Sequence, residues 1–86
     1  LAIIPINELS GISVYPNPAS DLVYISSIKP LTQASIVFLD LRGKEMLRKD
    51  VEAQTSAVDI SSLSAGAYFV KITSKEGEVV RRITVR

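Results

Sequence analysis

The chemically reactive side chains of this 86-residue chain are mainly carboxylates and basic groups, because it contains no His and no Cys. Without His, no Ser–His–Asp triad can form and the commonest transition-metal ligand is missing. Glu76 and Glu78 flank Gly77 but supply too few oxygens for a Ca²⁺ site. The four Asp fall at predicted turns or strand ends, where short carboxylates bind local backbone N–H groups: Asp21, Asp40, Asp50 and Asp59. With four glycines and no glycine-rich phosphate loop, we expect no enzyme activity, no cofactor and no metal.

Arg81, Arg82 and Arg86 form the one basic cluster of the sequence. Such a cluster on an edge strand can serve to prevent pairing with other chains. It can equally be a recognition element near the carboxyl end. The sequence leaves both interpretations open.

Aromatic side chains are few, and Tyr15, Tyr24 and Phe69 are the ones expected near the surface. Exposed aromatic rings can form a platform for a sugar. The more ordinary interpretation, which we favour, is that they are core residues or cross-strand partners.

Composition restricts the class of protein. The formal charge is +1, from ten Lys and Arg against nine Asp and Glu, so a nucleic-acid partner is not expected. The longest apolar runs are far below the roughly 18 residues of a membrane-spanning helix, and no signal peptide is present. Because the sequence starts at Leu1, we expect a fragment or processed product with a larger protein upstream.

A chain of this size forms one domain with a thin core, burying roughly 60–65% of its unfolded surface. Short alternating apolar segments separated by turn signals predict strands at 12–15, 22–26, 34–39, 44–51, 56–60, 67–74 and 79–85. The pattern is typical of an all-β, seven-stranded, immunoglobulin-like antiparallel β-sandwich. Segment 34–39 is apolar on both faces, which predicts a strand that is either central or covered on both sides.

Three turns have specific sequence signals. Pro16 and Pro18 fix φ and lack N–H donors, so they end the first strand. Asp40 and Gly43 fit a type I turn with a glycine bulge, which makes a hairpin. The next strand is expected to hold Met46 and Leu47 as its apolar anchors.

The third signal is a corner before the sixth strand. Gly66 can take a positive φ, and Leu63 is expected to fill the space under the bend. Tyr68 is expected to bury its ring while its hydroxyl bonds to the upstream backbone, as in a tyrosine corner.

Four segments in this order and spacing resemble one known family. They are Tyr-Pro-Asn-Pro-Ala-Ser-Asp at 15–21, Leu-Asp-Leu-Arg-Gly-Lys at 39–44, the corner and strand at 59–72, and the basic end at 80–86. Together they resemble the carboxyl-terminal sorting domain of the type IX (Por) secretion system of Bacteroidetes. The likeness covers about residues 12–86.

The resemblance implies a passive sorting signal that directs a larger cargo protein across the outer membrane. Residues 12–86 would be the sorting domain, and residues 1–11 a linker or arm that holds or borders a sortase cleavage site. The implied partners are the translocon, its shuttle, a cell-surface sortase and an upstream cargo domain. The implied route is the periplasm in transit, then the cell surface or the extracellular space.

The resemblance also assigns residues. The sorting-motif and structural residues are Tyr15, Pro16, Asn17, Pro18, Asp40, Gly43, Lys44, Leu63, Gly66 and Tyr68. Terminal recognition falls to Arg81, Arg82 and Arg86. Many members of the family have Lys near the end where this chain has Arg82 and Arg86, which keeps the charge and the donors.

Two alternative functions are compatible with a small β-sandwich. One is an immunoglobulin-like carbohydrate-binding or spacer module of a secreted glycosidase. The other is a structural domain that self-associates as a weak dimer through edge strands.

Overall fold

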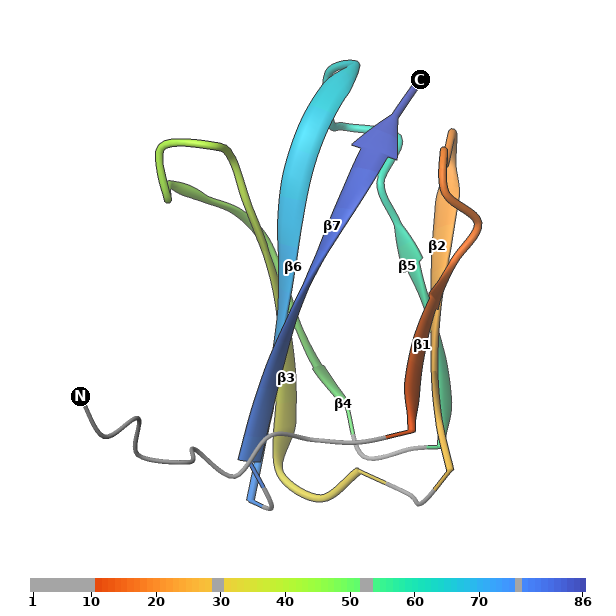
Figure 1. Cartoon of the computed structure of the whole chain (residues 1–86), viewed down its shortest axis with the longest axis vertical. Helices are drawn as coiled ribbons and strands as arrows, with labels where there is room; N and C mark the ends of the chain where they lie inside the picture. The colour runs from red at the N-terminus through yellow and green to blue at the C-terminus, as the bar shows by residue number, and fades with distance from the viewer. Residues whose placement is uncertain (1–10, 29–30, 52–53, 76) are drawn as a thin grey trace, which may run out of the picture.

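Two antiparallel sheets packed face to face make up the computed structural model, which describes residues 11–28, 31–51, 54–75 and 77–86 (Figure 1). The strands are β1 (Ile12–Tyr15), β2 (Leu22–Ser27), β3 (Ala34–Leu39), β4 (Glu45–Val51), β5 (Thr55–Asp59), β6 (Gly66–Ser74) and β7 (Gly77–Val85). The sheet orders are β1-β2-β5 and β4-β3-β6-β7. The predicted fold class is confirmed, and the predicted strands differ at their ends by one residue, or by two at the start of β7.

The predicted linker, residues 1–11, lies outside the described residues except for Gly11. Within the described residues, no helix is long and apolar enough to cross a membrane.

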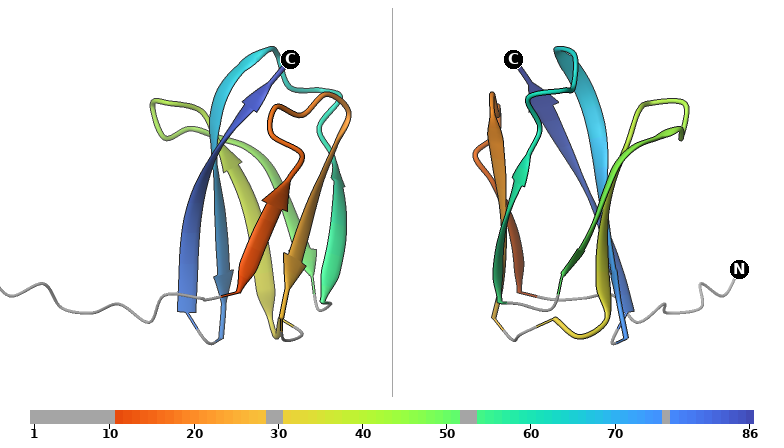
Figure 2. Two further views of the ribbon diagram at one scale, coloured as in Figure 1. Left: turned by 45° about the vertical axis from the view of Figure 1, so that its right-hand side comes forward. Right: turned by 180° about the vertical axis from the view of Figure 1, so that it is seen from behind.

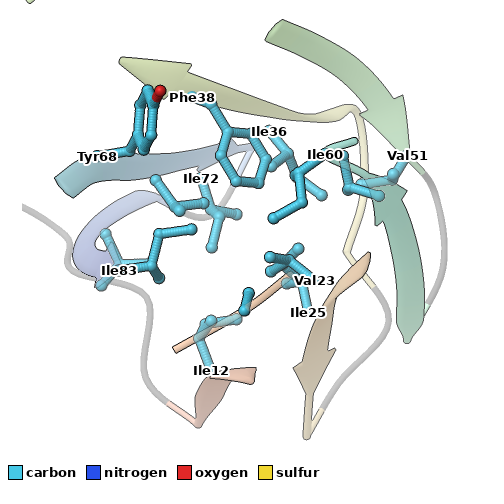
Figure 3. Close-up of a cluster of buried hydrophobic side chains, with 14 of the residues drawn as sticks. Ile12, Val23, Ile25, Ile36, Phe38, Val51, Ile60, Tyr68, Ile72 and Ile83 are labelled. Carbon is cyan, nitrogen blue, oxygen red and sulfur yellow. The ribbon is translucent and has the colours of Figure 1, made fainter. Parts of the chain in front are cut away.

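The core lies between the two sheets and is built from alternate residues of each strand (Figure 3). Val23 and Ile25 of β2 point inward as predicted and are 0% and 1% exposed. β3 lies inside its sheet, between β4 and β6. Its residues Ile36 and Phe38 are fully buried in the core, whereas Val37 is buried outside the core cluster. Of the two positions that the apolar faces of β3 allowed, central or covered on both sides, the structure has the strand inside its sheet.

The β3–β4 hairpin is held by the carboxylate of Asp40. This carboxylate accepts the backbone N–H groups of Arg42 at 2.8 Å and Lys44 at 2.9 Å. Gly43 donates its N–H to the carbonyl of Asp40 at 3.0 Å and has φ +88°, which is the conformation that favours glycine. The hydrogen bond from Lys44, followed by that from Arg42, lowers the pKa of Asp40. The predicted turn is confirmed.

The prediction that Met46 is an apolar anchor of β4 is wrong. Phe38 pairs with Leu47, but the next residue, Leu39, pairs with Glu45, so Met46 is the extra residue of a β-bulge. Met46 is 40% exposed, while Leu47 packs against the core. A bulge changes which side chains of the strand face the core. A rule based on two-residue alternation in the sequence cannot predict this change.

The corner before β6 follows the prediction. The ring of Tyr68 is buried, and its hydroxyl donates to the carbonyl of Ser64 at 2.6 Å. Leu63 is half-buried and packs against the core, with its N–H bonded to the carbonyl of Ile60 at 2.9 Å. Gly66 has φ +151°. The corner thus ties the β5–β6 connection to the buried face of β6.

Candidate recognition site at the last strand

β7 is an edge strand of the four-stranded sheet, paired on one side with β6 (Figure 1). The pairing is continuous from Gly66 opposite Val85 to Ser74 opposite Gly77. Val79, Ile83 and Val85 fill the core, with exposures of 1–3%. The last strand is therefore an integral part of the sandwich, and its other side is an edge at which another chain segment can pair.

The side chain of Asn17 bonds to this edge. Its Nδ2 donates to the carbonyl of Arg82 at 3.3 Å, and its Oδ1 accepts the backbone N–H of Thr84 at 3.0 Å. A carboxamide has one donor side and one acceptor side, so it occupies the edge as a peptide group of a neighbouring strand would. Pro16 and Pro18 on either side of Asn17 have no N–H to offer, which leaves the side chain to make these bonds.

Ala19 extends the same contact with its backbone. Its N–H donates to the carbonyl of Thr84 at 2.8 Å, and its carbonyl accepts the N–H of Arg86 at 2.8 Å. These bonds form a parallel bridge between Ala19 and Val85, and Ala19 is only 1% exposed. Figure 2 shows the β1–β2 loop beside the end of β7. We call Asn17 and Ala19 the β7 clamp.

The roles of Ala19 and Thr84 were not predicted from the sequence. The available signal was Asn17 between two prolines, a polar side chain whose neighbours lack donors. That signal indicates that Asn17 bonds to some backbone, but it does not identify a strand 65 residues away.

The three predicted recognition arginines are not gathered on one surface. Arg81 lies opposite Val70, on the face of β7 that otherwise packs into the core, yet its side chain is exposed. Arg82 lies opposite Phe69 on the outer face. Arg86 follows the strand, with its N–H held by the clamp. Among the described residues, no carboxylate forms a salt bridge with any of the three.

The remaining predicted motif residues lie in turns at one end of the sandwich. Figure 1 shows the β1–β2 loop, the β3–β4 hairpin, the β5–β6 corner and the end of β7 at the same end. Asp40, Gly43 and Lys44 belong to the hairpin, and Leu63 and Gly66 to the corner. Segments that are separate in the sequence therefore lie at the same end of the sandwich.

The exposed Tyr15 and the half-buried Tyr24 form a cross-strand pair, as the favoured interpretation expected. Tyr15 of β1 lies opposite Tyr24 of β2, and their rings stack at 5.7 Å between centroids with 23° between planes. Phe69 is half-buried on the outer face, between Leu39 and Arg82. These contacts use the rings within their own sheets.

Two of the carboxylates cap turns, as predicted. Asp40 holds the hairpin, and Asp59 accepts the N–H of Ser61 at 2.9 Å. The side-chain and backbone hydrogen bonds from Ser61 lower the pKa of Asp59. In the described part of the chain, no group of three or more His, Cys, Asp or Glu is placed to hold a metal ion.

The architecture defines the class of protein, an immunoglobulin-like β-sandwich. A solved DUF3244 family protein from Bacteroides vulgatus with this fold matches at a TM-score of 0.73 and 19% identity, over 86% of this chain and 83% of that chain. PorZ, a surface component of the type-IX secretion system of Porphyromonas gingivalis, matches at a TM-score of 0.65 and 22% identity. That match covers 88% of this chain and 11% of PorZ.

The chain belongs to the family of secretion system C-terminal sorting domains, whose model matches residues 13–86. It is also 41% identical over 71 residues to beta-agarase D of Zobellia galactanivorans, which covers 83% of this chain and 14% of the agarase. The resemblance to the type IX sorting domain is thus confirmed, and the carbohydrate-binding or spacer alternative is not favoured. The chain is a sorting domain that marks a cargo protein for export to the cell surface or the extracellular space.

Proposed function

We propose that the chain is a sorting signal, and that the export machinery recognises the folded end of the sandwich together with the residues of β7. The observation that carries the proposal is the β7 clamp, because it makes the Pro16–Pro18 motif and the basic end parts of one structure. In this proposal the domain folds in the periplasm as residues 12–86. The translocon and its shuttle then recognise it, and the upstream cargo passes through the outer membrane with it.

A cell-surface sortase then removes the domain by cutting within or beside residues 1–11. Such a segment suits cleavage because it precedes the first strand of the sandwich in the sequence. The residues read at the end are Arg81, Arg82 and Arg86, which are exposed and form no salt bridge within the described residues. Charged groups that are unpaired and on the surface are available to a partner.

The test is export of a periplasmic reporter protein fused ahead of residues 1–86, in a bacterium with a type IX system. We expect the reporter on the surface or in the medium, and in the periplasm of an isogenic strain without the translocon. Retention of the reporter in both strains, with the fused domain shown to be folded, would contradict the proposal.

Deleting residues 80–86 is a poor test of recognition by itself, because it removes the buried residues Ile83 and Val85 and so unfolds the domain. The paired variant Arg82→Gln and Arg86→Gln is sharper, since both side chains are exposed. We expect this variant to keep its melting temperature and to lose most export. The matched control is Lys75→Gln, which changes an exposed charge in the β6–β7 turn at the other end of the sandwich.

A further inference from the structure

Among the described residues, contacts to the outer edge of β7 involve its second half. The clamp forms hydrogen bonds with backbone groups of β7 that point away from β6. These groups are the carbonyl of Arg82, the N–H and the carbonyl of Thr84, and the N–H of Arg86. Backbone groups of a strand alternate in direction, so Val80 also points away from β6. Its carbonyl accepts the Nη1 of Arg81 at 3.2 Å. Among the described residues, the N–H groups of Val80 and Arg82 have no partner, and we call Glu78–Arg82 the open edge.

The side chains along the open edge are apolar and basic. Val80 is 49% exposed, and Arg81 and Arg82 are exposed on opposite faces of the strand. The carboxylate of Glu78 is engaged by Lys71 at 3.6 Å. An incoming strand would therefore meet unpaired positive charge on both of its faces.

The other edges differ from this one. Lys49 of β4 donates to the carbonyl of Ala57 of β5 at 2.7 Å, which joins the two sheets at the opposite side. β4 also carries charge of both signs, including an ion pair between Arg48 and Glu45 at 3.0 Å. β1 has four residues, and a strand this short is a poor template for pairing.

We propose that the open edge binds an extended acidic segment of a protein partner by strand addition. The main-chain bonds of Val80 and Arg82 would supply affinity, and carboxylates facing Arg81 and Arg82 would supply specificity. The proposal rests on the proposed function, because it names how a component of the export machinery would read β7. The clamp would set the limit of the added strand, since beyond Arg82 the edge is already paired.

Charge decides between an acidic partner and a second copy of this chain. Antiparallel pairing of two open edges would place the arginines of one copy against those of the other, and like charges directly opposite destabilise a strand pair. A charged residue on the inward face of an edge strand, such as Arg81, also opposes pairing of that edge with strands of other molecules. A carboxylate opposite Arg81 removes that penalty, so the same residue rejects neutral or basic strands and accepts acidic ones.

The test uses the 86-residue chain and a short capped peptide in which Glu alternates with Val and Thr. Its controls are the same peptide with Lys in place of Glu, and the Glu peptide with methylated backbone nitrogens. We expect the Glu peptide alone to bind, with affinity falling as salt rises. We also expect it to slow amide hydrogen exchange of Val80 and Arg82 at least about tenfold.

Variants separate backbone pairing from charge. Val80→Pro removes an outward N–H without removing a β6–β7 bond, and we expect it to weaken binding about five- to tenfold. Its matched control, Val80→Ala, keeps the N–H and should lose less. Because alternating Glu residues share one face of a strand, Arg81→Gln and Arg82→Gln should differ in effect and show which face the carboxylates meet.

Equal binding of the Lys peptide, protection at another strand, or no effect of Val80→Pro would overturn the proposal. So would protection of Val80 and Arg82 that grows with protein concentration without peptide, since a second copy would then occupy the edge. Export of a fused reporter distinguishes failure of the strand-addition proposal from failure of the proposed sorting function. A reporter that is exported normally with Val80→Pro overturns strand addition alone, whereas a wild-type fusion that is not exported overturns the proposed function.

Discussion

Asn17 and Thr84 are 67 residues apart in the chain, yet the Oδ1 of Asn17 accepts the backbone N–H of Thr84 at 3.0 Å. The same carboxamide donates to the carbonyl of Arg82 at 3.3 Å. Asn17 therefore bonds to β7 on both sides of one residue, in the place where a further strand would pair. This relationship joins the Pro16–Pro18 loop to the strand that carries the basic end.

Asn17→Ala should lower the free energy of unfolding by about 1–2 kcal/mol, since it removes two hydrogen bonds that are partly exposed to solvent. Urea denaturation measures this change. Amide exchange of Thr84 should speed up while that of Phe38, in the central strand, should not. Ser20→Ala in the same loop is the control and should change stability by less than about 0.5 kcal/mol. Unchanged protection of Thr84 would show that the carboxamide does not hold β7.

Local sequence signals predicted the strands, the hairpin and the corner because each depends on residues that are close in the chain. Asp40 bonds to residues two and four positions away, and Tyr68 to one four positions away. Alternation identified Val23 and Ile25 as core residues for the same reason. Such features are fixed by turn chemistry and by the two-residue period.

The clamp and the bulge at Met46 could not be predicted because they depend on distant partners. Nothing near Asn17 indicates that its partner is the backbone of β7, since any strand edge offers the same groups. Met46 is not the predicted apolar anchor because the register of β4 shifts against β3 at this residue. Arg81 shows a third limit, because its position in the alternation is a core position and only its place on an edge strand leaves it exposed.

The hydroxyl of Tyr68 offers a test of the corner. Tyr68→Phe keeps the buried ring but loses the 2.6 Å bond to the carbonyl of Ser64, and should cost about 0.5–1.5 kcal/mol. Tyr68→Ala also leaves a cavity and should cost about 3–5 kcal/mol. Thermal and urea unfolding of the two variants measure the difference. Equal losses would mean that the ring contributes nothing beyond its hydroxyl.

Gly66 tests the backbone of the same corner. Apart from the two adjacent residues, no heavy atom of the described chain lies within 4 Å of where a Cβ would stand, so Gly66→Ala meets no clash there. Its φ of +151° is nevertheless unfavourable for other residues, and we expect a loss of about 1–2 kcal/mol from backbone strain alone. The control is Ala65→Ser, an exposed neighbour. A fully stable Gly66→Ala protein would show that the corner relaxes to an ordinary φ.

Acid should weaken the β3–β4 hairpin through Asp40. Hydrogen bonds, first from Lys44 and then from Arg42, hold the pKa of Asp40 below its ordinary value of 3.8. A carboxyl whose pKa is lower in the folded state stabilises the fold above its ordinary pKa, and this stabilisation is lost as pH falls through the folded pKa. NMR titration of the side-chain carboxyl carbon should give a midpoint below 3.8. The Asp40→Asn variant has no carboxyl to protonate at this position, so its free energy of unfolding should fall less in acid than that of the wild type. An equal fall in both proteins would mean that other carboxyls cause the loss of stability.

Two neighbouring residues at the end of β7 separate folding from recognition. Val85 is 2% exposed and belongs to the core, so Val85→Ala should cost about 1–3 kcal/mol. Arg86→Ala removes an exposed side chain but keeps the backbone N–H that bonds to Ala19, so stability should change by less than about 0.5 kcal/mol. If the terminal charge is read during export, Arg86→Ala should reduce surface delivery of a fused reporter while its melting temperature stays constant. Normal delivery of Arg86→Ala alongside loss with Val85→Ala would mean that the machinery requires the folded strand and does not read this arginine.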